Sequence, residues 1–420
     1  MVLYKDELNV ERISPENKHF FFGYYDISPE SPDGKHILAC NPPFIDRMPS
    51  IGDYLRIGYF ESGSNEFNCV GRTTAWNYQE GCRLQWISNT QFIYNVRTDS
   101  GFGSEVYDII EKQIVKVFKY PVYSVSKESF LATSYGFVNN KYNYPHTNDE
   151  EKSNTYGDGV YILNLQTGEY KLTIPLISLV SITKTEHCKN WVEYCSFDPT
   201  GHRFFIYHRW NDNHGDAGTH LCVGDVDGNI KTLLISRSIS HAGWKGSNQI
   251  TAWCRVPSAI NAIQRSRTVS KSFLFKFAKR IYHALVKSPS MRQKITNDAY
   301  VTFNVDSGER AKIDNEAFVS DGHCTWNRNT RYMLTDTYPD ENKMRNLLLF
   351  DEQKNEVYHL GSYYSYPRDM EKANQGWNVS GMRCDLHPKW TEKEQFIYFD
   401  SVHEGFRGLY RIDVSSITNK

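Results

Sequence analysis

Residues 194–208, YCSFDPTGHRFFIYH, contain the pattern that decides the fold. Aromatic residues are followed by a short polar turn and then by a strand of β-forming residues. The same order returns in residues 24–40, 83–95, 123–134, 241–253, 323–336 and 387–400. A second unit of strand, turn and strand follows each copy, in residues 57–69, 106–118, 160–172, 221–234, 300–313, 347–360 and 409–417. Seven units of four strands predict an all-β chain, a seven-bladed β-propeller.

The spacing of the repeats also predicts how the chain is organised. Two large β-sandwiches would use as many strands, but they do not account for the regular spacing. We therefore expect residues 1–420 to form a single propeller domain. The last repeat is short of a fourth strand, and the alternating apolar run 2–13 is expected to complete that blade and close the ring. A frayed N-terminus is the alternative.

The composition is that of a β-rich globular protein. Aromatic residues make up 14% of the 420 residues. Nine cysteines are scattered singly with no CxxC pair, which disfavours a disulfide scaffold or a zinc ribbon. The net charge of -1 gives no bulk attraction for nucleic acid. Because the sequence shows neither a secretory signal nor an apolar stretch long enough to span a bilayer, we expect a cytoplasmic protein.

A basic insertion interrupts the fifth blade at residues 256–296. It contains nine Lys and Arg and no Asp or Glu, so the rest of the chain has 39 basic against 49 acidic residues. Phe273, Phe277, Ile281 and Leu285 recur every four residues, which predicts an amphipathic basic helix over about residues 270–287. Such a helix either packs on its own propeller or contacts an anionic surface, which would place the protein at the periphery of the inner membrane.

Histidines stand in register in the last three blades. Three residues before the aromatic residue of the repeat lie His241, His323 and His387. Since the innermost strand of every blade starts beside the central channel, these imidazoles are expected to converge on the propeller axis. Together with Asp385, an oxygen ligand, they predict a divalent metal site. A single histidine at such a position is more often structural, but three equivalent ones favour a functional site.

Cations are expected on the same rim, because the first and second strands of each blade begin and end there. Arg209 is one of these rim cations, and the predicted substrate-binding residues are Arg83, Arg97, His208, Arg255, Tyr338, Arg383 and His403. A guanidinium group matches carboxylate, sulfate or phosphate, although some of these arginines are expected to form ion pairs between blades. The chain has no P-loop, GxGxxG or GxSxG, which disfavours nucleotide-dependent and serine-hydrolase activities.

With these residues in place, the sequence resembles the oligogalacturonate lyase family, propeller enzymes that cleave uronic-acid oligosaccharides by β-elimination. The resemblance lies in the repeats and in two motifs, SDGHCTW (residues 320–326) and DLHPKW (residues 385–390). It implies a manganese-dependent lyase acting on an anionic oligo- or polysaccharide. It further implies that His323 and His387 bind the metal, that His241 is the catalytic base, and that Arg209 is the catalytic arginine.

The sequence also departs from that family. The family's last motif has two histidines separated by one residue and preceded by a glutamine, whereas Asp385 and Met382 occupy these places here. Two other functions therefore stay open. One is a glycoside hydrolase or glycosyltransferase of surface-polysaccharide metabolism, for which Asp336, Asp385 and Asp400 would supply carboxylates. The other is a non-catalytic propeller that binds a glycan or a protein.

Overall fold

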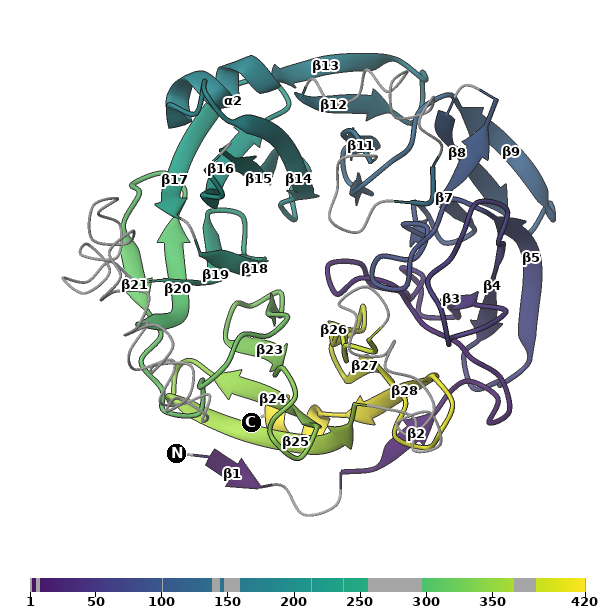
Figure 1. The fold of residues 1–420 in the computed structure, drawn as a ribbon. Helices are drawn as coiled ribbons and strands as arrows, with labels where there is room; N and C mark the ends of the chain where they lie inside the picture. Colours follow the sequence, from purple (N-terminus) through teal and green to yellow (C-terminus); the bar gives the residue numbers. More distant parts are fainter. Residues whose placement is uncertain are drawn as a thin grey trace.

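The computed structural model describes residues 2–4, 8–99, 101–137, 144–146, 159–212, 214–236, 238–255, 297–365 and 383–419. Seven β-sheets are arranged in a ring around a central axis, as Figure 1 shows. The predicted seven-bladed β-propeller is thus confirmed. The basic insertion 256–296, including the predicted helix 270–287, lies outside the described residues, between the second and third strands of blade five.

The blades follow the sequence in order. Blade one has three strands, β3 (His36–Asn41), β4 (Leu55–Glu61) and β5 (Phe67–Thr73). Blades two and three consist of β6 (Gln85–Trp86), β7 (Gln91–Thr98), β8 (Gly101–Asp108) and β9 (Gln113–Phe118), then β10 (Val125–Ser126), β11 (Leu131–Ser134), β12 (Gly159–Asn164) and β13 (Tyr170–Pro175). Blades four and five consist of β14 (Lys189–Phe197), β15 (Arg203–Asn211), β16 (Ala217–Asp225) and β17 (Ile230–Ser236), then β18 (Ile239–Lys245), β19 (Gln249–Arg255), β20 (Asp298–Asn304) and β21 (Arg310–Lys312).

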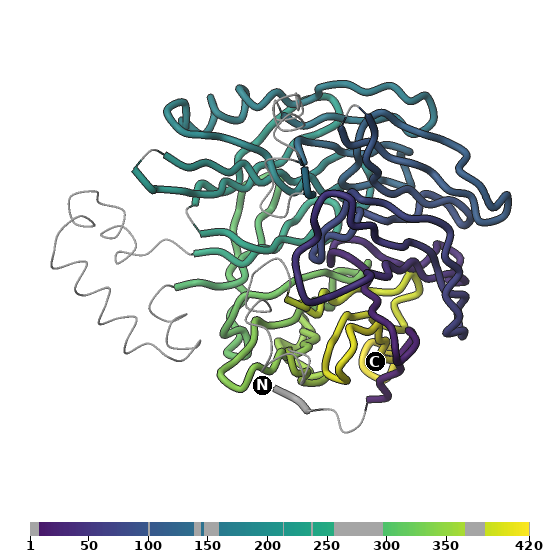
Figure 2. The backbone as a smooth tube through the Cα atoms, turned by 45° about the vertical axis from the view of Figure 1, so that its right-hand side comes forward, coloured from purple at the N-terminus to yellow at the C-terminus, as the bar shows by residue number. Residues whose placement is uncertain are grey.

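The last two blades include strands from the N-terminal segment. Blade six contains β22 (Thr325–Trp326), β23 (Tyr332–Asp336), β24 (Met344–Asp351) and β25 (Glu356–Tyr364), and β1 (Val2–Tyr4) pairs parallel to β25. Blade seven contains β26 (Lys389–Trp390), β27 (Phe396–Ser401) and β28 (Gly408–Asp413), and β2 (Val10–Arg12) adds antiparallel to β28. Figure 2 shows the purple N-terminal segment beside the yellow C-terminal strands. The prediction that this segment completes the last blade and closes the ring is confirmed for β2, whereas β1 joins blade six.

The repeated aromatic residue explains how neighbouring blades are joined. Four of the repeat tryptophans donate their indole N–H to the preceding blade: Trp86 to the Pro29 carbonyl, Trp244 to the Ser196 carbonyl, Trp326 to the Thr251 hydroxyl and Trp390 to the Thr325 carbonyl, at 2.8–3.4 Å. Buried indole groups normally find such a partner, and each one fixes the angle between two sheets. Gly201 in the DPTG turn has a φ of 69°, and a Cβ there would lie 1.9 Å from the Ser126 hydroxyl of blade three.

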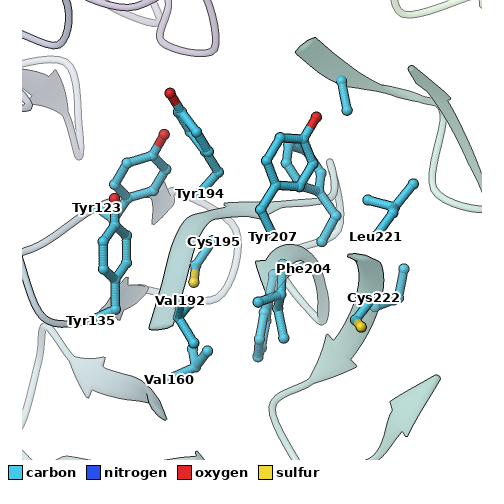
Figure 3. Close-up of a cluster of buried hydrophobic side chains, with 14 of the residues drawn as sticks. Tyr123, Tyr135, Val160, Val192, Tyr194, Cys195, Phe204, Tyr207, Leu221 and Cys222 are labelled. Carbon is cyan, nitrogen blue, oxygen red and sulfur yellow. The ribbon is translucent and has the colours of Figure 1, made fainter. Parts of the chain in front are cut away.

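The core lies between the blades and consists largely of aromatic and aliphatic side chains. The cluster drawn in Figure 3 joins blades three and four through Tyr135, Val160, Val192 and Phe204. Outside the strands, α2 (Leu176–Thr183) connects blades three and four, and α7 (Ser415–Thr418) follows β28. No described helix is long and apolar enough to cross a membrane.

Candidate active site

Backbone geometry directs the repeat residues toward the axis. Arg83, Tyr194 and His387 occupy the same repeat position, and their φ angles of 54°, 55° and 43° are left-handed. At Tyr194 a β-bulge shifts the pairing of β14 with β15 between Glu193 and Cys195. A left-handed backbone costs a residue with a Cβ roughly 1–2 kcal/mol, and such strain clusters at functional sites.

The three in-register histidines meet on the axis. The ring centroids of His241 and His323 are 4.0 Å apart, and those of His323 and His387 are 4.4 Å apart. One ligand atom each from His323, Asp385 and His387 lies within 4.8 Å of the others. The expectation that adjacent blades bring these imidazoles together is met, and their role as metal ligands stays a prediction.

Each of the three imidazoles is oriented through its Nδ1 atom. The acceptors are Asp321 Oδ1 for His241 (3.0 Å), Asp336 Oδ1 for His323 (2.8 Å) and the Gly23 carbonyl for His387 (3.2 Å). An Nδ1–H that donates to such an oxygen leaves the lone pair of a neutral ring on Nε2. The Nε2 atom of His387 is buried and has no hydrogen-bond partner in the part of the chain that the structure describes. Metal-ligating histidines are usually oriented in the same way, by a hydrogen bond from the ring nitrogen that does not bind the metal.

Burial keeps the two innermost rings neutral. Burial is the main cause that lowers the pKa of His387 well below its usual value, and the nearby His323 and Lys389 act in the same direction. Burial also lowers the pKa of His323, although the carboxylate of Asp336 opposes the shift. Neutral imidazoles are the forms that bind metals and accept protons.

Asp385 is held by two arginines rather than left open. Its Oδ1 pairs with Arg345 Nη2 at 2.5 Å, and its Oδ2 accepts a hydrogen bond from Arg383 Nε at 3.0 Å. Burial would raise the pKa of Asp385, but the charges of Arg345 and Arg383 outweigh it and lower that pKa. Among the described residues Oδ1 has this ion pair but no hydrogen bond, and Asp385 lies in the group that could hold a metal ion, so its role as a metal ligand stays a prediction.

A pocket adjoins His241, and Arg209 lines it as well. Arg209 pairs through Nε with the buried carboxylate of Glu193 and donates from Nη1 to the Thr219 hydroxyl at 2.9 Å. The side chains of Arg209 and His241 remain 23% and 11% exposed. The two residues assigned as catalytic thus share one pocket, whose wall also includes Tyr338.

Two tyrosines of blade one complete the pocket, and the sequence did not identify them as site residues. Tyr24 lies 5.1 Å from His387 between ring centroids and donates from its hydroxyl to that of Tyr194 at 3.3 Å. The hydroxyl of Tyr25 donates to the Ala242 carbonyl at 2.8 Å and accepts from the Ala242 N–H at 3.1 Å. Both tyrosines stand in the sequence HFFFGYYD (residues 19–26), which forms no regular inner strand. The register of the repeats therefore did not mark them as pocket residues.

The remaining predicted substrate-binding residues do not line this pocket. Arg83 is fully buried and binds both oxygens of Asp26 at 3.0 and 2.9 Å. His208 is also fully buried, between the Thr183 hydroxyl and the Asn190 amide oxygen. These positions contradict the prediction that Arg83 and His208 bind substrate. The polar atoms of both side chains have hydrogen-bond partners inside the protein. Strand order predicts that a residue lies near the rim, but it does not predict which partners its side chain finds.

The other rim residues have protein partners as well. Arg255 pairs with Asp298, Arg97 donates to the Pro145 carbonyl, Arg383 donates to the Tyr338 hydroxyl, and the ring of His403 bonds the Ser401 hydroxyl. Arg383 reaches the pocket only through Tyr338. The structure therefore does not bring Arg97, Arg255 or His403 to the pocket. Arg255 and His403 bond residues of their own blades, and Arg97 bonds Pro145, which lies between β11 and β12 of blade three.

Comparison with known proteins establishes the fold. No family model and no curated protein matches the sequence. Oligogalacturonate lyase from Vibrio parahaemolyticus has a similar structure, with a TM-score of 0.61 over 97% of this chain and 94% of that chain, at 11% identity. Hydrazine synthase of Kuenenia stuttgartiensis follows with a TM-score of 0.50, 9% identity, and coverage of 92% of this chain and 95% of that chain.

An oligogalacturonate lyase in complex with manganese is 10% identical, with a TM-score of 0.43 over 98% of this chain and 95% of that chain. At such identities, the likeness shows a shared propeller fold rather than a shared activity. The resemblance to oligogalacturonate lyases is therefore confirmed for the fold alone.

Proposed function

We propose that this propeller is a lyase that cleaves a uronate-containing oligo- or polysaccharide by β-elimination, and that it acts in the cytoplasm. The observation that carries the proposal is the position of His241. Its Nδ1 is held by Asp321, and its ring lines the same pocket as the guanidinium group of Arg209. A base and a carboxylate-binding cation in one pocket are the groups that this reaction requires.

The first half of the reaction removes a proton from the sugar carbon next to the carboxylate. Nε2 of His241 accepts this proton, and the carboxylate of Asp321 stabilises the imidazolium that results. Arg209 binds the substrate carboxylate and stabilises the negative charge that develops on it. Glu193 and Thr219 hold Arg209 from behind, so the guanidinium group is already oriented before the substrate binds.

The second half breaks the bond between the neighbouring sugar carbon and the glycosidic oxygen. The electron pair from the broken C–H bond forms the new carbon–carbon double bond, and the leaving oxygen takes up a proton. The phenol groups of Tyr24 and Tyr194 line the pocket and are hydrogen-bonded to each other. We assign the proton donor to Tyr194, which stands on the strained backbone of β14 and faces the same pocket as His241.

The described residues also fit a metal in part. His323 and His387 would hold a divalent ion through Nε2, and the unpartnered buried Nε2 of His387 supports this. A bound ion would supply Lewis-acid stabilisation of the substrate carboxylate. We expect manganese, titrated into the protein in a calorimeter, to bind the wild type and not His387→Ala. If the wild type binds no manganese, the metal part of the proposal is wrong.

The described carboxylates offer little support for a hydrolase. Asp336, Asp385 and Asp400 are each at most 1% exposed, and none lines the pocket. Hydrolysis needs two carboxyl groups that flank the scissile bond.

Oligogalacturonides, alginate and hyaluronan oligosaccharides should be incubated with the protein while the ultraviolet absorbance of an unsaturated uronate is followed. We expect turnover of at least one of them and its loss in His241→Asn. His403→Asn is the matched control, because His403 lies outside the pocket, and it should keep full activity. No absorbance change with any of the three substrates would contradict the proposal.

A further inference from the structure

A second open pocket lies on blade four, on the other side of its sheet from the candidate active site. Along β15, Tyr207 and Arg209 line the active-site pocket, whereas Trp210 lines this second pocket. Alternate residues of a strand point to opposite faces, so one strand serves both pockets. The second pocket, which we name the blade-four groove, has a volume of about 550 Å³, and Thr183 at the end of α2 lines it. Pockets of this size accommodate small ligands.

Two ordered turns form the walls of the blade-four groove. Asp212 Oδ1 accepts the backbone N–H groups of His214 and Asp216, at 2.9 and 2.8 Å. On the other side, the side-chain amide of Asn190 donates to the carbonyl groups of Thr185 and Cys188, at 2.9 and 2.8 Å. Both walls are therefore fixed by hydrogen bonds of the chain itself, and the groove is preformed.

The floor of the groove contains polar atoms that the protein does not satisfy. His220 is only 2% exposed, and neither of its ring nitrogens has a hydrogen-bond partner among the described residues. The indole Nε1 of Trp210 lacks one too. The indole lies over Gly218, where a Cβ would come within 2.8 Å of it, so a glycine is needed for this position. Leaving three buried polar atoms unpaired costs folding free energy unless something in the groove pairs with them.

The chemistry of the floor indicates what would pair with it. Burial lowers the pKa of His220 to about 4, so the ring is neutral near pH 7 and offers one donor and one acceptor. The indole of Trp210 adds a second donor. Ile235, 57% exposed, supplies an apolar wall, and the charged residues that line the groove are Lys184, Asp212 and Asp216, one cation against two carboxylates. Hydroxyl groups both donate and accept, and a sugar ring carries several of them around an apolar face.

We propose that the blade-four groove is a saccharide-binding site, which holds one sugar residue of a glycan against Trp210, His220 and Ile235. The site does not depend on the proposed elimination reaction, because none of these residues lines the active-site pocket. Ordered water in place of a sugar is the competing occupant and is an outcome of the test below.

The test follows the indole N–H resonance of Trp210 in nitrogen-15-labelled protein, assigned by its loss in Trp210→Phe. Trigalacturonate and the neutral trisaccharide maltotriose are titrated separately. We expect one of them to shift this resonance to saturation. No shift with either sugar would overturn the proposal and leave water as the occupant.

Variants locate the binding. Ile235→Asp should weaken it at least tenfold, since the change removes the apolar wall at an exposed position where folding is not at risk. Ile177→Asp on α2 is the matched control, because Ile177 is 69% exposed and lies outside the groove, and it should bind as the wild type does. Binding unchanged in Ile235→Asp would also overturn the proposal. His241→Asn should leave binding intact, which separates this site from the active-site pocket.

Discussion

Replacing Asp321 by Asn tests the assignment of His241 as the base. The carboxylate accepts from His241 Nδ1 at 3.0 Å, and the two side chains are only 11% and 14% exposed, so water does not readily replace the contact. An amide at this position can donate to Nδ1, which moves the ring proton to Nε2 and removes the lone pair that faces the pocket. General-base catalysis contributes about 10²–10⁴-fold, so we expect kcat to fall by that factor, about 3–5 kcal/mol of activation free energy.

The assay compares kcat and KM of wild type, Asp321→Asn and the control Asp314→Asn on the substrate that the protein turns over. Asp314 is an exposed acid whose side chain is 90% accessible and pairs only with Lys312 on the surface, so its loss should leave both constants unchanged. In Asp321→Asn the loss of activity should appear in kcat, with KM nearly constant. The free energy of unfolding should change by less than about 1 kcal/mol. A kcat within threefold of the wild type would refute the role of this hydrogen bond.

Three further predictions follow from other parts of the molecule. Burial lowers the pKa of His208 to about 4 from 6.5, so its contribution to stability is present above pH 6.5 and is lost as the pH falls toward 4. His208→Gln should therefore flatten the pH dependence of denaturant unfolding in that window by up to about 1.4 kcal/mol per pH unit, and an unchanged slope would contradict the shift. Arg209→Lys keeps a charge beside Glu193 but loses the fork, so kcat/KM should fall by about 10², whereas an equal loss for an uncharged substrate would argue against carboxylate binding. The protein should co-sediment with phosphatidylserine vesicles at low salt, at about 1 kcal/mol for each Lys or Arg near the surface, and deletion of residues 256–296 should abolish this. Equal sedimentation of the two proteins would exclude a membrane role for that segment.

The sequence predicted the architecture well because the same sequence pattern recurs in each blade. The repeat places an aromatic residue before each turn, and in four blades it is a tryptophan whose indole bonds the preceding blade, so seven copies of one pattern were visible without any structure. The prediction failed where the repeat breaks. Blade one has no regular inner strand, and the helix α2 between blades three and four was not predicted, since its eight residues carry no clear amphipathic period.

The sequence predicted those parts of the candidate site that depend on equivalent positions in the repeats. The alignment of His241, His323 and His387 placed them on the axis because equivalent strands begin at equivalent depths. Register does not show which partner a side chain finds. Arg83 is drawn into the core by Asp26, and Asp385 is paired by Arg345, a residue far away in the sequence. Asp321 precedes His323 by two residues, yet it serves the histidine of the neighbouring blade.

The mass balance of cleavage in water labelled with heavy oxygen distinguishes elimination from hydrolysis. Elimination breaks the glycosidic bond without adding water. We expect the masses of the two products to add up to the mass of the substrate, with no label in either product and one fragment unsaturated. His241→Asn should yield neither fragment. Products that together exceed the substrate by one labelled water would show hydrolysis and contradict the account.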